Sequence, residues 1–151
     1  MDVDGTLTDG KIYMGAQGEI MKAFNIKDGA GIHDILLPKG IIPIIITGRT
    51  SDIVKMRCKE LGITDVFQGV SDKTKQLREL LEKHDCSLVN TAYIGDDIND
   101  LQCINLVKQG GGIVGCPADA IEEVKSSSDF IAHKNGGDGA VREFIEWLVV
   151  N

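Results

Sequence analysis

The spacing of hydrophobic positions changes repeatedly along the chain, and each change marks an expected element. From residue 41 onward, short apolar runs alternate with stretches in which apolar residues recur every three or four positions. Continuous apolar runs are typical of strands buried on both faces, and the longer spacing is typical of amphipathic helices. The predicted strands are 44–47, 65–69, 91–94, 111–116 and 129–133. The predicted helices are 50–62, 71–85, 98–110, 118–127 and 139–150.

The first forty residues follow a different pattern. Residues 11–25 alternate around the glycine-rich turn "GAQG" and predict a β-hairpin. Residues 28–40 carry apolar side chains at helical spacing, and Pro38 with Gly40 predicts the end of that helix.

Strands alternating with helices over short connections favour a parallel sheet covered by helices on both faces. We therefore expect an α/β, three-layer, Rossmann-like fold in a single domain spanning residues 1–151. In such sheets ligands bind beyond the carboxyl ends of the strands, so the residues that follow each strand are the candidates for function.

Composition narrows the possible partners. The net charge of −7 and the absence of a basic run argue against nucleic acid and anionic membranes. No apolar run approaches the ~20 residues that span a bilayer. The four cysteines are scattered without metal-ligand spacing, which favours reduced thiols in a cytoplasmic protein. An anionic substrate would need local cations, backbone N–H groups or a metal.

Side chains suited to one kind of chemistry lie at four places, three of them after predicted strands and the first after a strand that would have to precede Asp2. They are Asp2 with Asp4, then Thr47-Gly48-Arg49, then Lys73, and finally the acidic run Asp96, Asp97 and Asp100. Carboxylates that converge repel one another unless a cation neutralises them, and oxygen ligands with room for water favour Mg²⁺. A threonine and a lysine facing that cation would cradle a phosphoryl group. Taken alone, Asp97 is equally consistent with capping a helix.

In this order, "DVDGTLTDG", "ITGR", Lys73 and "GDDIND" resemble the four motifs of the haloacid dehalogenase superfamily of phosphotransferases. The resemblance implies that Asp2 is the nucleophile and that Asp4 is the general acid and base. It also implies that Thr47 and Lys73 hold the transferring phosphoryl group.

The same resemblance implies a magnesium site. Its ligands would be Asp2, the backbone carbonyl of Asp4, and Asp96. Asp100 would lie outside these ligands and hold them in position, and Asp97 would help to do so.

Many members of the superfamily carry a cap domain, and no segment here is long enough to form one. The stretches "DGKIYMGAQGEIMKAFNIKDGAGI", "FQGVSDK" and "NGGDGAVREF" resemble the capless 3-deoxy-D-manno-octulosonate 8-phosphate phosphatases. That resemblance implies a homotetramer in which the hairpin 11–25 of a neighbour helps to enclose an anionic sugar phosphate. Gly48 and Arg49 would then contact the substrate, with Arg142 as a possible anchor for its carboxylate.

Alternatives remain open within this pattern. Nonulosonate (sialic acid type) 9-phosphate phosphatases share it, as does a phosphatase-like domain associated with acylneuraminate cytidylyltransferases. An inactive tetramerisation module is the non-enzyme alternative. A phosphoacceptor receiver domain is disfavoured because it lacks the Asp-x-Asp-Gly-Thr signature, and a phosphomutase because it usually needs a cap.

One feature departs from the superfamily pattern: no strand precedes Asp2. In the family fold that strand is central, so we expect a gap in the middle of the sheet with unpaired backbone groups. We interpret Met1 as an internal methionine or the chain as a fragment.

Overall fold

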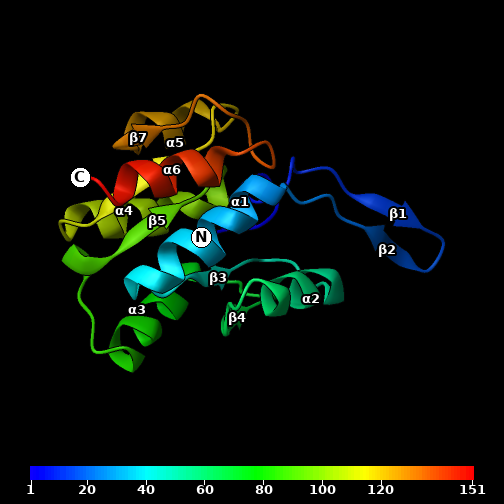
Figure 1. Cartoon of the computed structure of the whole chain (residues 1–151), viewed down its shortest axis with the longest axis horizontal. Helices are drawn as coiled ribbons and strands as arrows, with labels where there is room; N and C mark the ends of the chain where they lie inside the picture. The colour runs from blue at the N-terminus through cyan, green and yellow to red at the C-terminus, as the bar shows by residue number, and fades with distance from the viewer.

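The computed structural model describes all 151 residues and contains the predicted alternation of strands and helices (Figure 1). Its parallel strands are β3 (Ile44–Ile46), β4 (Asp65–Phe67), β5 (Ala92–Ile94), β6 (Ile113–Cys116) and β7 (Phe130–Ile131). The helices that follow are α2 (Asp52–Glu60), α3 (Lys73–Lys83), α4 (Leu101–Gln109), α5 (Glu122–Ser127) and α6 (Ala140–Leu148). The predicted elements are confirmed, with strands shorter than the apolar runs suggested.

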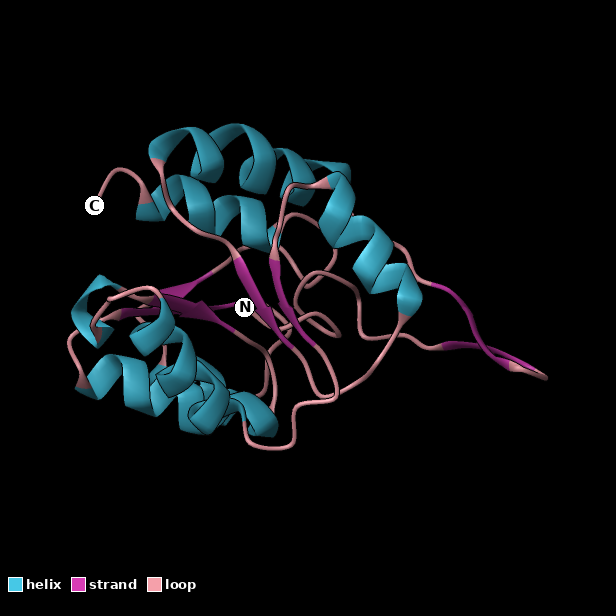
Figure 2. Cartoon of the chain, turned by 90° about the horizontal axis from the view of Figure 1, so that it is seen from below, coloured by secondary structure: helices cyan, strands magenta, loops and turns pink.

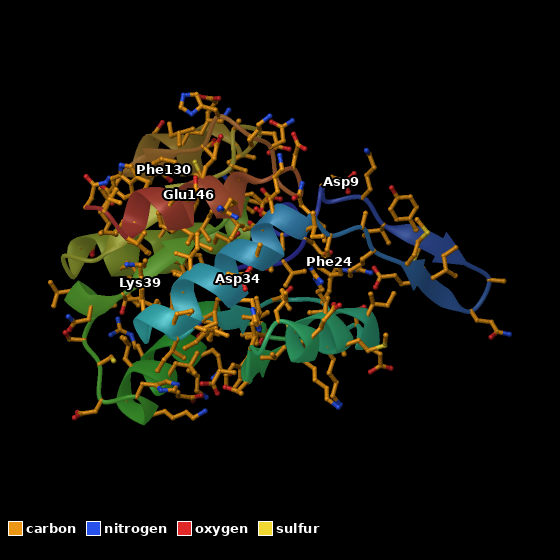
Figure 3. All side chains as sticks on the ribbon, viewed as in Figure 1. Asp9, Phe24, Asp34, Lys39, Phe130 and Glu146 are labelled. Atoms are coloured by element: carbon orange, nitrogen blue, oxygen red, sulfur yellow. The ribbon has the colours of Figure 1, made fainter.

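Two hydrophobic clusters lie on opposite faces of the strands, which gives the predicted three layers (Figure 2). One cluster joins the segment after the hairpin with α2 and α6, and the other joins α3, α4 and α5. Aromatic packing extends the first cluster at β7. The ring of Phe130 (Figure 3) lies 5.2 Å from that of Trp147, centroid to centroid.

The hairpin projects from the body of the molecule and consists of β1 (Tyr13–Gly15) and β2 (Gly18–Met21) (Figures 1 and 2). Helix α1 (Ile26–Ala30) follows, earlier than the pattern predicted, because the Asn25 side chain accepts a hydrogen bond from Lys27 N and caps it. One π-helical segment (31–36) and one 3₁₀ turn (37–39) continue it. Gly40, with φ of 72°, ends the run as predicted.

Apart from the hairpin, the strands form two separate sheets, β3–β4 and β5–β6–β7, and the first two residues lie between them. The α-amine of Met1 donates to Ile44 O at 2.9 Å, and Ile46 N donates to Met1 O at 3.1 Å. On the other side, Asp2 N donates to Ile94 O at 3.1 Å. Residues 1–2 therefore occupy the end of a central strand position, and the predicted gap in the sheet is confirmed.

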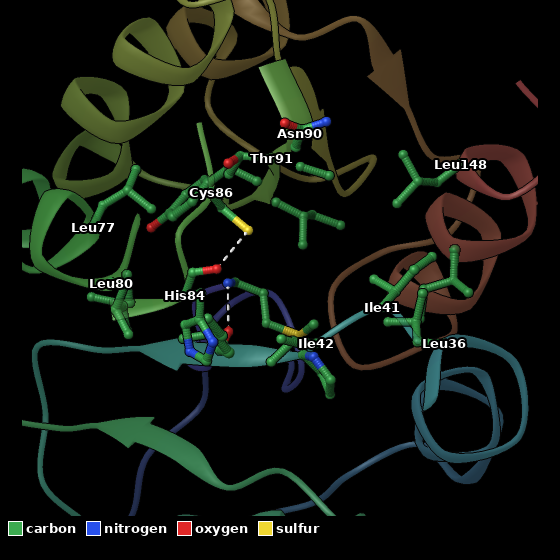
Figure 4. Close-up of a pocket in the computed structure, with 18 of the residues that line it drawn as sticks. Leu36, Ile41, Ile42, Leu77, Leu80, His84, Cys86, Asn90, Thr91 and Leu148 are labelled. Carbon is green, nitrogen blue, oxygen red and sulfur yellow. Dashed lines mark hydrogen bonds between the residues drawn. The ribbon is translucent and has the colours of Figure 1, made fainter. Parts of the chain in front are cut away.

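An apolar cavity of about 320 Å³ continues this gap beyond Met1 (Figure 4). Leu36, Ile42, Leu77 and Leu148 are among the side chains that line it. Met1 lines one end of this cavity, and burial lowers the pKa of its α-amine from 8.0 to about 6.

All four cysteines carry free thiols, as predicted. None of the helices has both the length and the apolar character needed to cross a membrane.

Candidate active site

A tight loop carries the first two candidate carboxylates away from the sheet. Val3, fully buried, accepts hydrogen bonds through its carbonyl from Leu7 N (2.8 Å) and Thr8 N (3.0 Å). Asp2 and Asp4 therefore sit at the start of a closed turn whose backbone is fixed from within.

Asp2, Asp96 and Asp100 converge as predicted, and one carboxylate oxygen from each lies within 4.8 Å of the others. Burial raises the pKa of Asp96 to about 7, and the charges of Asp2 and Asp100 add to this increase. Burial and the charge of Asp100 likewise raise the pKa of Asp2. Three acidic groups thus share a small volume in which further negative charge is unfavourable.

Lys73 is the cation that faces this cluster. Its Nζ lies 3.0 Å from Asp2 Oδ1 and 2.8 Å from Asp100 Oδ1. Burial disfavours the charged ammonium, but the two carboxylates outweigh burial and raise the pKa of Lys73. One ammonium facing three carboxylates leaves an excess of negative charge.

The acceptor positions of Asp100 are filled by the protein. Its Oδ1 accepts from Lys73 and from the Tyr93 hydroxyl at 2.7 Å, and its Oδ2 accepts from Asp96 N at 3.1 Å. Asp97 is exposed, and its side chain accepts from Ile98 N at 2.7 Å, so it caps the following turn. Asp100 is therefore placed to orient its neighbours.

The remaining oxygens suit a hard divalent cation. Asp2 Oδ1 is buried and accepts no hydrogen bond of good geometry, although Lys73 Nζ is near. Gly5 has φ of +92°, and a Cβ there would overlap the Asp96 carboxylate, so the missing side chain leaves room for that group. All-oxygen donors around an uncompensated negative charge fit Mg²⁺.

Thr47 directly follows β3. Its amide donates to Phe67 O at 2.9 Å, and its carbonyl accepts from Val70 N at 3.1 Å. The residue is buried. Gly48 follows, where a Cβ would meet Val70 O at an ordinary 3.8 Å.

Two charged residues at the end of the hairpin join the site, and the sequence analysis did not identify them. Lys22 forms an ion pair with Asp4, and its Nζ lies 2.9 Å from Glu19 Oε1. Arg49 lies near both acids, with Nε 3.8 Å from Asp4 Oδ2 and one terminal nitrogen 3.6 Å from Glu19 Oε1. The Glu-x-x-Lys spacing of Glu19 and Lys22 can be seen in the sequence. No sequence pattern indicates that the hairpin docks onto the strand ends.

The same docking affects the start of α2. Ser51 occupies the N-cap position, but its hydroxyl donates to Glu19 Oε2 at 2.7 Å and makes no capping bond. The side chain that would cap the helix instead fixes the hairpin.

The glycine-rich stretch before α6 also borders the site. Gly137 N donates to Thr6 O at 3.1 Å, and Gly136 lies against the backbone of Gly5. Arg142, in contrast, is not brought to the other candidates within one chain. Its Nε donates to Glu146 Oε1 at 2.6 Å along α6, so its substrate-binding role stays a prediction.

A parallel sheet that ends in paired aspartates, a threonine, a lysine and an acidic turn defines a class of hydrolase. Residues 45–145 match the haloacid dehalogenase-like hydrolase family, and the chain belongs to it. It is 43% identical to the 3-deoxy-D-manno-octulosonate 8-phosphate phosphatase of Salmonella typhi, over 99% of this chain and 77% of that protein.

Two solved structures are similar over 99% of this chain. The phosphatase of the same name from Yersinia pestis is 41% identical, with a TM-score of 0.91 over 78% of its length. The Moraxella catarrhalis enzyme, solved with magnesium, phosphate and the sugar acid KDO, is 42% identical, with a TM-score of 0.91 over 83%.

Proposed function

We propose that this chain is a Mg²⁺-dependent phosphatase that hydrolyses 3-deoxy-D-manno-octulosonate 8-phosphate. The observation that carries the proposal is the cluster of Asp2, Lys73, Asp96 and Asp100, assembled in a chain that is similar to such phosphatases over almost its whole length. We further propose that residues 1–151 act as one hydrolase domain and, from the four free thiols, that it works in the cytoplasm.

In the proposed reaction, a carboxylate oxygen of Asp2 attacks phosphorus and the phosphorus–oxygen bond to the sugar breaks. Asp4 donates a proton to the departing sugar oxygen. Water then attacks the aspartyl-phosphate, Asp4 takes the proton of that water, and phosphate leaves with Asp2 restored. Thr47 and Lys73 hold the phosphoryl oxygens during both steps, since phosphoryl transfer depends mainly on positioning and charge neutralisation.

Asp2, Asp96 and the carbonyl of Asp4 would hold Mg²⁺, with Asp97 and Asp100 outside them. Bound there, the cation would screen the repulsion between an attacking carboxylate and a phosphate dianion. Asp100 already accepts from Asp96 N and Lys73, which keeps both groups oriented.

We propose a tetramer in which neighbouring subunits close the site. The hairpin exposes apolar side chains that a single chain does not cover: Ile12, Met14, Ile20 and Met21. Several large apolar side chains exposed on one short hairpin are typical of a contact between proteins. Arg49 and Gly48 would face the substrate from the same chain, and Arg142 would reach it only after repositioning or from a neighbour.

The test is phosphate release from octulosonate 8-phosphate and nonulosonate 9-phosphate, compared side by side with Mg²⁺ and with a chelator. We expect faster turnover of the octulosonate ester, dependence on Mg²⁺, and a loss of at least about a thousandfold in Asp2→Asn. Faster turnover of the nonulosonate ester would mean that nonulosonate 9-phosphate, and not octulosonate 8-phosphate, is the substrate. A folded chain without turnover would favour the inactive module.

A further inference from the structure

Asp4 is surrounded by a ring of alternating charges that comes largely from the hairpin. Lys22 pairs with Asp4, Glu19 pairs with Lys22, and Arg49 lies between the two acids. Its two cations and two carboxylates balance, so the ring carries no net charge. It therefore does not neutralise the excess negative charge around Asp2.

Three of the four side chains in this ring are largely withdrawn from water, whereas Arg49 is 44% exposed. The side chain of Lys22 is 1% exposed, that of Glu19 11% and that of Asp4 18%. A long ammonium side chain loses much conformational freedom and hydration when it is buried, so its position requires specific partners. Here both partners are carboxylates, and one of them is the proposed acid and base.

The contact between Lys22 and Asp4 is not needed to attach the hairpin. Glu19 already anchors the hairpin to the body through the Ser51 hydroxyl at 2.7 Å, with Arg49 nearby. Lys22 instead reaches past Glu19 to a residue eighteen positions earlier, in the loop after the sheet. Its ammonium therefore constrains the orientation of the Asp4 carboxyl group.

We propose that Lys22, held by Glu19, is a positioning residue that fixes the Asp4 carboxyl group toward the leaving-group oxygen. The inference rests on the proposed role of Asp4 as general acid and base. Proton transfer requires the carboxyl oxygen within hydrogen-bond distance of the departing oxygen, and small misplacements cost large factors in rate.

The proposal makes the effect of Lys22 depend on the leaving group. A sugar alkoxide is a poor leaving group and requires the proton of Asp4, whereas p-nitrophenolate leaves without one. A residue that acts only by holding the fold together would affect both esters equally.

The experiment compares kcat of the wild type, Lys22→Met and Lys22→Arg on octulosonate 8-phosphate, phenyl phosphate and p-nitrophenyl phosphate. In Lys22→Met we expect kcat to fall about a hundredfold on the sugar ester, less on the phenyl ester, and less than about threefold on the nitrophenyl ester. Lys22→Arg keeps the charge and should recover part of the loss. Lys11→Met is the matched control, because Lys11 lies on the same hairpin and pairs only with Asp9.

A double-mutant cycle completes the test. In an Asp4→Asn background, Lys22→Met should cause no further loss on the sugar ester, because it acts through Asp4. Equal losses on all three esters, or additive losses in the cycle, would overturn the proposal. If the sugar ester is not hydrolysed while the aryl esters are, the proposed substrate is wrong, and the two aryl esters still measure the role of Lys22.

Discussion

Gly5 and Asp96 meet at the floor of the site, where the Asp96 carboxylate occupies the space that a side chain on Gly5 would fill. Gly5 also has φ of +92°, which residues with a Cβ rarely adopt. The loop after the sheet and the acidic turn after β5 can therefore converge only with glycine at this position.

Gly5→Ala should destabilise the protein by at least about 2 kcal/mol, because it adds backbone strain and displaces Asp96. It should also weaken Mg²⁺ binding at least about tenfold, since Asp96 is a proposed ligand. Thermal unfolding and magnesium titration by calorimetry measure the two effects. Gly48→Ala is the stability control, as a Cβ there meets its nearest neighbour at 3.8 Å. Equal Mg²⁺ affinity in Gly5→Ala and the wild type would contradict this assignment.

Lys73→Met should destabilise the metal-free protein by about 3–5 kcal/mol, because Asp2 and Asp100 lose the ammonium that they share. Mg²⁺ should raise the Tm of this variant more than that of the wild type, since the cation replaces the lost charge. Differential scanning calorimetry with and without Mg²⁺ measures both effects. Lys75→Met, on the exposed side of the same helix, should change neither. An equal Mg²⁺ effect in Lys73→Met and the wild type would mean that the cation binds elsewhere.

The raised pKa of Asp96 predicts a pH-dependent stability in the presence of a chelator. In the folded protein its pKa is about 7, against an ordinary value of 3.8, so between these values the native state holds the extra proton. Stability from this group is therefore lost as pH rises from about 4 to about 7.

Asp96→Asn tests this effect. Without metal, its Tm relative to the wild type should rise as pH increases from 4 to 7, because only the wild type must ionise a buried carboxyl group. Thermal unfolding at several pH values in a chelator provides the comparison. A constant Tm difference across this range would show that Asp96 has no raised pKa.

The cavity beyond Met1 predicts that an apolar extension of the chain stabilises the fold (Figure 4). Four residues such as Val-Ile-Val-Leu, joined to Met1, could pair with β3 and β5 and fill the space between Leu36 and Leu77. Each large side chain buried there contributes about 1.5–3 kcal/mol, against ~1–2 kcal/mol of backbone entropy lost per ordered residue, so the net gain comes from the residues whose side chains fill the cavity. A Gly-Ser-Gly-Ser extension of equal length is the control. The apolar extension should raise Tm by several degrees relative to it, and equal Tm values would contradict the prediction.

Much of this architecture could be predicted because local pattern and burial agree. The run at Ile44–Ile46 is apolar at every position and forms a buried strand, and the acidic turn 96–100 follows β5 as expected. The separation of β3–β4 from β5–β6–β7 was predictable once the family pattern was considered. Convergence of Asp2, Lys73 and Asp96 then follows from the shared edge of a parallel sheet.

The rest depends on contacts between distant segments, which spacing does not determine. Glu19 and Lys22 could have been solvated charges, and only the docking of the hairpin onto α2 places them beside Asp4. Arg142 shows the converse. Its partner Glu146 lies four residues along the same helix, a local pairing that was readable from the sequence and competes with a distant role.

The two sheets that carry the site are connected through the backbone of residues 1–2. Thr47 moves with β3 and Asp96 with β5, while the backbone of residues 1–2 links these strands through the hydrogen bonds from Ile46 N and from Asp2 N. A phosphate bound between Thr47 and Asp96 would link the two sheets. Its binding should therefore slow hydrogen exchange at the amides of Asp2 and Ile46, which connect the same sheets.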